Sequence, residues 1–344
     1  MKLAHFRAFE SLSQHFSSTG LLIKDPSHQQ SSFLIFIDAV LRGVGQVMLQ
    51  NNSYTGLLFL AGIFYNSIVL GCAALLGSIV STGTAQLLGV ERTSIQAGLF
   101  GFNGVLVAIA LLYFLEPTGL TWGYVVLATA SSTVIMAAML SVLKTWNLPT
   151  LTAPFVLTTL LFILACARFG QLHSTGVLPT AGLPKAAASI EGVVTLSTLI
   201  EGLFTGIAQV FFQGNLITGL FFIIGLLISS RVVCIAALLG SLLGALVAWG
   251  MGAAEPAIRA GAFGFNSVLT AIVFGGGIFI MNKSTAVYGI LAVIVTAVVF
   301  AALSATLEPL GMPALTSAFI LVVWLFVLAA PYFSNIHLVQ PSDQ

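Results

Sequence analysis

The chain has 344 residues, of which 58% are hydrophobic and only 6% are charged, and its formal net charge is +1. A mean hydropathy of +1.08 excludes an ordinary soluble domain, because soluble proteins carry roughly 25% charged residues. The near-zero charge and the lack of a basic cluster also argue against nucleic-acid binding. We therefore expect an all-α integral membrane protein in contact with lipid.

The N-terminal residues, 1–32, are polar and are predicted to form a tail without the features of a signal peptide. A first membrane unit is predicted over residues 33–167. Its apolar segments are 33–49, 55–70, 71–88, 97–115, 124–144 and 151–167. A helix that crosses the hydrocarbon core needs about 20 apolar residues. Because several segments are barely long enough, we expect at least one half-length or re-entrant helix, which the sequence does not identify.

The second half of the chain repeats the first. Residues 43–62 match residues 206–225 at ten of twenty positions, and residues 98–109 match residues 261–272 at nine of twelve, both at an offset of 163. This similarity predicts two homologous units, with a transport pathway where they meet. Residues 168–197 are then the connection, residues 198–333 the second membrane unit and residues 334–344 a C-terminal tail.

Several features that other mechanisms require are missing from the sequence. It contains no GxxxxGK[ST] phosphate-binding loop, so ATP hydrolysis is not expected. All five histidines lie outside the apolar segments, and the three cysteines lie singly within them. We therefore predict no catalytic residues, no cofactor and no metal site, and the chain is not expected to be an enzyme.

Charged residues within apolar segments are candidates for a functional role. Asp38 and Glu201 are equivalent by the offset of 163. Asp38 has Arg42 four residues later, on the same helical face, whereas Glu201 has Thr205 at that position and no such partner. The sequence leaves two interpretations open, a structural role and a role at the mouth of a pathway.

Polar and aromatic residues also recur at equivalent positions. Each half has a glutamine that can donate and accept hydrogen bonds without a charge, a phenylalanine and a leucine four residues apart, and a threonine after a proline. They are Gln46 and Gln209, Phe102 with Leu106 and Phe265 with Leu269, and Thr152 and Thr316. Each feature alone is compatible with simple helix packing, but their matched recurrence favours a pseudo-symmetric pathway.

The sequence LPTLTAPF at residues 148–155 resembles the LPxxTxPF signature of the urea transporter family, and a degenerate copy surrounds Thr316. The duplicated GFN blocks strengthen the resemblance. It implies two inverted halves, each with five membrane helices and one half-length pore helix, and a homotrimer with one pore in each protomer. The second copy departs from the signature, since Met312 replaces leucine and Ala318 replaces proline.

The resemblance also implies roles for individual residues. Paired phenylalanines form flat slots and threonines guard the narrow middle of the pore. Carried over by position, the slot residues are Phe102 and Phe265 with Leu106 and Leu269 beside them, the central pair is Thr152 and Thr316, and the further lining is Gln46, Val47, Gln209 and Val210. Phe212 stands where the first half has Leu49, so the two slots are expected to differ.

Urea is flat, neutral and rich in N–H groups, which suits a slot between aromatic rings. We therefore predict a urea channel of the bacterial inner membrane that works by facilitated diffusion. The main alternative is a gradient-coupled carrier for another small neutral polar solute. An ammonium-type channel would require histidines at the middle of the membrane, and a membrane enzyme would require a catalytic cluster.

Overall fold

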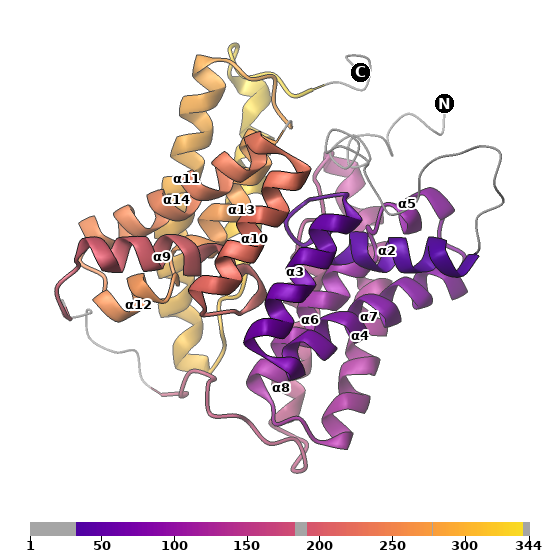
Figure 1. Ribbon diagram of the computed structural model, residues 1–344. Coiled ribbons are helices and arrows are strands. Elements are labelled where there is room, and N and C mark those ends of the chain that lie inside the picture. The colour runs from indigo at the N-terminus through magenta and orange to yellow at the C-terminus, as the bar shows by residue number, and fades with distance from the viewer. Residues whose placement is uncertain (1–31, 183–190, 277, 340–344) are drawn as a thin grey trace.

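A computed structural model describes residues 32–182, 191–276 and 278–339 of the chain. The predicted N-terminal tail therefore lies outside the described residues except for Ser32, as do residues 340–344 of the predicted C-terminal tail. All regular elements of the described chain are helical. Figure 1 shows the helices up to α8, in indigo to magenta, beside those from α9 onward, in orange to yellow.

The first half of the described chain contains seven α-helices and one short 3-10 turn. They are α2 (Ser32–Gln46), α3 (Ser53–Asn66), α4 (Ile68–Leu87), α5 (Arg92–Gln96), α6 (Gly101–Phe114), α7 (Gly119–Leu143), η1 (Lys144–Trp146) and α8 (Ala153–Cys166). The expected segment at residues 97–115 is thus shorter as a helix. Gly98 adopts a φ of +74°, and a Cβ there would lie 2.4 Å from the Gly43 nitrogen, so the chain turns before α6 begins.

The α-helices of the second half follow the same order at the offset of 163 to 164 positions, with two additional 3-10 turns, η2 and η4. Its elements are α9 (Leu196–Ala208), η2 (Gln209–Phe211), α10 (Leu216–Ser229), α11 (Arg231–Gly250), α12 (Glu255–Arg259), α13 (Gly264–Gly275), α14 (Lys283–Leu307), η3 (Glu308–Leu310), α15 (Ser317–Ala329) and η4 (Ala330–Tyr332). The domain limits drawn from the sequence and the inverted relation of the halves remain predictions.

Four helices of the described chain are long and apolar enough to cross a membrane: α4, α7 with η1, α11, and α14 with η3. The pair formed by α9 with η2 and α10 passes the same test as one segment bent by 75°. The helices α6, α8, α13 and α15 are shorter and apolar, at 10 to 17 residues. A helix of 14 residues is about 21 Å long, less than the roughly 30 Å of hydrocarbon, so the described chain contains the short apolar helices that the sequence led us to expect.

Helix starts in the two halves use equivalent residues. The side chains of Asn52 and Asn215 accept hydrogen bonds from the first backbone N–H groups of α3 and α10. Ser67 and Ser230 do the same for α4 and α11. Such caps satisfy N–H groups that have no partner within the helix. They also explain why the second and third apolar segments divide at Ser67 rather than after Leu70.

The two halves meet through α3 and α10, which lie side by side. The Thr55 hydroxyl donates to the Gly225 carbonyl at 2.8 Å, and the Thr218 hydroxyl donates to the Gly62 carbonyl at 3.0 Å. Thr55 and Thr218 are equivalent by sequence, and so are the two glycines. These reciprocal hydrogen bonds hold the two halves together along α3 and α10.

Candidate functional site

A cavity of about 250 Å³ lies between elements of both halves. Most of its lining comes from η2, α14, η3 and the segment before α15, while α6, α8, α13 and Pro179 complete the wall. The lining residues are Tyr113, Phe155, Pro179, Gln209, Val210, Phe212, Phe265, Phe300, Ser304, Glu308, Met312, Pro313, Ala314, Leu315 and Thr316. The volume suits a molecule of a few heavy atoms.

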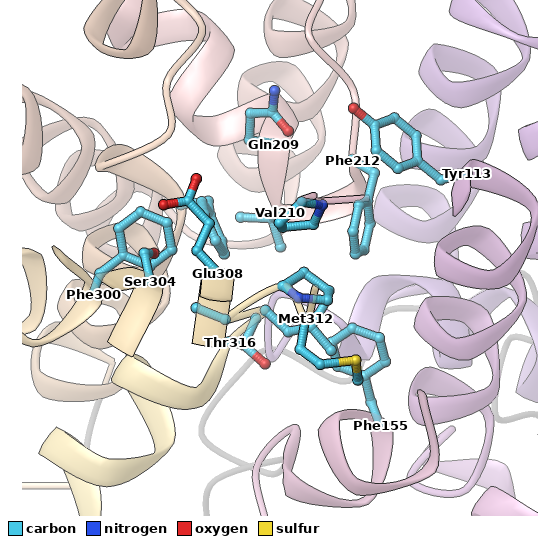
Figure 2. A pocket seen from close by; sticks show the side chains of 15 residues that line it. Tyr113, Phe155, Gln209, Val210, Phe212, Phe300, Ser304, Glu308, Met312 and Thr316 are labelled. Carbon is cyan, nitrogen blue, oxygen red and sulfur yellow. The ribbon is translucent and has the colours of Figure 1, made fainter. Parts of the chain in front are cut away.

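Five of the eleven site residues predicted from the sequence line this cavity: Gln209, Val210, Phe212, Phe265 and Thr316. All belong to the second half. Figure 2 shows Val210 near the centre of the view, with Gln209 above it, Phe212 on one side and Phe300 on the other. The sequence therefore identified residues that the fold brings together from η2, α13 and the start of α15.

The other six predicted residues are buried and are not among the residues that line the cavity. They are Gln46, Val47, Phe102, Leu106, Thr152 and Leu269, each no more than 3% exposed. The Gln46 amide donates to the Ala97 carbonyl at 2.8 Å, so this glutamine ties α2 to the turn before α6. Their roles in a pathway remain predictions.

Thr152 and Thr316 are in direct contact. Their hydroxyl oxygens lie 2.7 Å apart, which is a hydrogen bond. Both side chains are buried at 3% exposure, and Thr316 forms part of the cavity wall while Thr152 lies behind it. The hydroxyl pair thus joins the two halves at the inner end of the cavity.

A strained backbone positions each threonine. Leu151 and Leu315, the residues just before them, have φ values of +49° and +50°. This left-handed conformation costs about 1 kcal/mol or more for a leucine. Its occurrence at both equivalent positions indicates that the surrounding fold enforces it, so each threonine begins its helix at a fixed place.

The asparagines of the two GFN blocks provide part of that support. The Asn103 side chain accepts a hydrogen bond from the Phe155 backbone N–H, and Asn266 does the same for Phe319, each at 3.0 Å. Asn266 also donates to the Leu315 carbonyl at 3.1 Å. Each asparagine therefore connects a GFN block to the signature segment of its own half, a role that sequence spacing alone did not indicate.

Aromatic rings form two sides of the cavity. Phe265 and Phe300 have ring centroids 5.2 Å apart in an edge-to-face arrangement. On the other side, Phe212 lies 5.4 Å from Tyr113 and 6.3 Å from Phe155. Such rings present flat apolar walls whose faces weakly accept N–H groups.

Sequence reasoning missed the contribution of α14 and η3. Phe300, Ser304 and Glu308 are spaced four residues apart, which places them on one helix face, and all three line the cavity. The four-residue spacing of these side chains could have indicated that they share one helix face. A comparison of the two halves does not reveal them, because the equivalent of Phe300 in the first half is Met136, and that of Glu308 is Lys144.

The buried charge in the first half is paired. The Arg42 guanidinium lies 2.6 Å from the Asp38 carboxylate and also donates to the carbonyl and side-chain oxygens of Asn51. Ser53 donates to Asp38 at 2.6 Å. None of these residues lines the cavity. The ion pair therefore holds the end of α2 against the start of α3, as the structural interpretation expected.

Glu201 also has a charged partner, although not at the position four residues along its own helix. The Arg259 guanidinium lies 2.6 Å from its carboxylate and 2.7 Å from that of Glu255. The partner is 58 residues away on α12, which packs against α9, so a search four residues along the helix could not find it. Hydrogen bonds from Thr198 and then from Arg259 lower the pKa of Glu255 below its ordinary value.

Comparison with known proteins gives the decisive observation. The family model described as urea transporter matches residues 37–331. The chain belongs to the urea transporter family. Urea transporter 1 from Ovis aries is 31% identical over 308 residues, which cover 88% of this chain and 79% of the relative. Urea transporter 1 from Rattus norvegicus is 30% identical over the same shares.

Family membership agrees with the structure's apolar helices and makes the chain a multi-pass integral membrane protein and a transporter rather than an enzyme. Urea transporter 1 from Capra hircus, 31% identical over 308 residues, covers the same 88% of the chain. The family resemblance noted in the LPTLTAPF sequence is thereby confirmed.

Proposed function

We propose that the chain forms a selective urea pore that carries urea passively, down its own gradient, through the cavity and past the Thr152–Thr316 pair. Urea fits the lining in two respects. Its flat shape matches walls of phenylalanine, and its N–H and C=O groups match the hydroxyls, amide and carboxylate at the edges. The observation that carries the proposal is the pair of threonine hydroxyls 2.7 Å apart at the inner end of the cavity.

Threonine hydroxyls would replace the water that urea loses on entry. A hydroxyl can donate and accept, so each can serve either the carbonyl or an N–H of urea. Passage requires the direct hydrogen bond between the two hydroxyls to be exchanged for bonds to urea, which keeps the net cost small. A metal ion would lose its hydration without a compensating charge beside the threonines, and this loss would oppose its passage.

We further propose that the protein assembles as a homotrimer with one pore in each protomer, and that it resides in a bacterial inner membrane. The described helices support a pore within one protomer, because the cavity and both threonines come from a single chain. Exposed apolar side chains on α7, α11 and α14 are suited to lipid or to a neighbouring protomer.

Urea flux in proteoliposomes, followed by stopped-flow light scattering, tests this function. Flux should follow the urea gradient and should be unchanged when a protonophore or a sodium ionophore collapses the ion gradients. A flux that stops under either treatment would favour a gradient-coupled carrier. Empty liposomes and liposomes with heat-inactivated protein are the controls for leakage.

A further inference from the structure

The mouth of the cavity carries a carboxylate that the proposed urea pathway does not require. Glu308 begins η3 and follows Phe300 and Ser304 along one helix face. In Figure 2 these three residues stand on the same side of the cavity, opposite Phe212 and Tyr113. An acidic group therefore lies next to an aromatic wall, in a space of about 250 Å³.

Among the described residues, no basic side chain lines the cavity to offset this charge. None of the fifteen described residues that line it is a lysine, arginine or histidine. Glu308 also takes part in none of the three salt bridges among the described residues, which involve Asp38, Glu201 and Glu255. Its carboxylate receives no side-chain hydrogen bond within the described part of the chain, so its oxygens are available to a ligand.

We infer that the cavity binds small planar cations of the guanidinium class at Glu308, and that such a cation blocks the pathway. Guanidinium has the flat outline of urea and carries a positive charge. Its N–H groups form a fork that matches both oxygens of a carboxylate. Its face can also pack on the rings of Phe300 and Phe265, since aromatic faces attract cations.

The same lining explains why a bound guanidinium would stay at the mouth. Thr152 and Thr316, at the inner end, are uncharged and 97% buried, since each is 3% exposed. Moving a cation past them would separate it from Glu308 and from water together, which is costly in an apolar surrounding. Urea is uncharged and does not incur this cost, so urea passes the threonines while guanidinium of the same flat shape stays at Glu308.

The site is expected at one end of the pathway only. In the first half the position equivalent to Glu308 is Lys144, which is exposed and repels cations. The inference deepens the proposed urea function, and the block can be measured as urea flux only if that function is correct. A direct measurement of guanidinium binding does not depend on urea transport. The experiment therefore uses both measurements.

The flux experiment places equal guanidinium chloride on both sides of the vesicle membrane, so that protein orientation does not matter. Concentrations stay far below those that unfold proteins, and sodium chloride keeps the ionic strength constant. Guanidinium should lower urea flux in the wild type, while sodium alone should not. In Glu308→Gln the half-inhibitory concentration should rise about fivefold, because a partly exposed ion pair contributes up to ~1 kcal/mol.

Two variants serve as matched controls. Glu116→Gln removes an exposed carboxylate that does not line the cavity, and it should leave the block unchanged. Glu308→Asp keeps the charge and should retain the block. Both should elute from size-exclusion chromatography in detergent as the wild type does.

Equilibrium dialysis of radiolabelled guanidinium against the purified full-length protein measures binding without transport. Binding to the wild type and Glu116→Gln, with weaker binding to Glu308→Gln, supports the inference even if urea flux is absent, in which case only the proposed function fails. Equal binding to the wild type and Glu308→Gln, or an equal block of their flux, would overturn the inference. Absence of any block or binding in the wild type would do the same.

Discussion

Replacing Thr152 and Thr316 by valine, singly and together, tests the central contact of the proposed pore. Valine has nearly the shape of threonine but no hydroxyl, so the bore changes little. In the wild type each hydroxyl is the other's partner at 2.7 Å. A single substitution removes one hydrogen-bonding group from the pathway and leaves the other hydroxyl buried without that partner.

The expected loss of flux follows from the cost of an unmatched polar group. A buried donor or acceptor without a partner costs about 1 to 3 kcal/mol. If passing urea loses one such partner at the barrier, flux should fall about 5- to 150-fold. The urea fluxes through Thr152→Val and Thr316→Val should lie within about an order of magnitude of each other, because the two hydroxyls share one contact.

The double variant separates transport from stability. Its flux should be no higher than that of the slower single variant, because both hydroxyls are gone. Its thermal stability should exceed that of the single variants, because removing both partners leaves neither hydroxyl unsatisfied. Opposite rankings of flux and stability cannot arise from poor folding alone.

Stopped-flow urea flux per reconstituted protein and thermal unfolding in detergent provide the two measurements. Normal flux through both single variants, with intact assembly, would refute the placement of the barrier at the threonines. A large defect in only one of them would preserve the pore but refute the equal contribution of the halves. A double variant less stable than both singles would refute the energetic argument.

Three further predictions distinguish the cavity wall from the core and test an ion pair. Phe265→Ala should weaken the discrimination of urea from bulkier solutes, measured by flux competition. Phe102→Ala should instead lower stability by about 3 to 5 kcal/mol, because that ring is 2% exposed in the core. Glu255→Gln should lower the unfolding temperature at neutral pH. Because the pKa of Glu255 is lowered in the folded protein, its ionised carboxylate stabilises the fold at pH values above its unfolded pKa of about 4.3. This stabilisation is lost as the pH falls through the lower pKa of the folded state. The difference in unfolding temperature between Glu255→Gln and the wild type should therefore shrink on acidification.

The sequence was sufficient to predict the helices and the family, because both depend on repeated patterns. The six predicted apolar segments fall on α2, α3, α4, α6, α7 and α8, while the short helix α5 lies between two of them, and the offset of 163 to 164 predicts the second set. The ends of the helices were predicted less well. They depend on local groups such as the Ser67 cap and the left-handed Gly98, which a count of apolar residues does not detect.

The site was predicted only in part, for a physical reason. Repetition pairs Phe102 with Phe265 and Gln46 with Gln209, but only the second member of each pair lines the cavity. Equivalent positions need not have equivalent surroundings, since the first half has Met136 at the position equivalent to Phe300, which lines the cavity. Glu308 has no acidic counterpart, so a search for matched residues could not have found it.

The contact between α3 and α10 has a consequence for how the chain tolerates change. Thr55 donates to Gly225 of the other half as Thr218 donates to Gly62, and the equivalent rings of Phe59 and Phe222 pack with their centroids 4.9 Å apart. This is the isologous pattern of a two-fold dimer, in which one patch pairs with its own copy. In a homodimer every substitution occurs twice, once in each subunit. In a single polypeptide a substitution changes one half only. The cavity can therefore carry a carboxylate in the second half alone, while the interface between α3 and α10 keeps its self-complementary form.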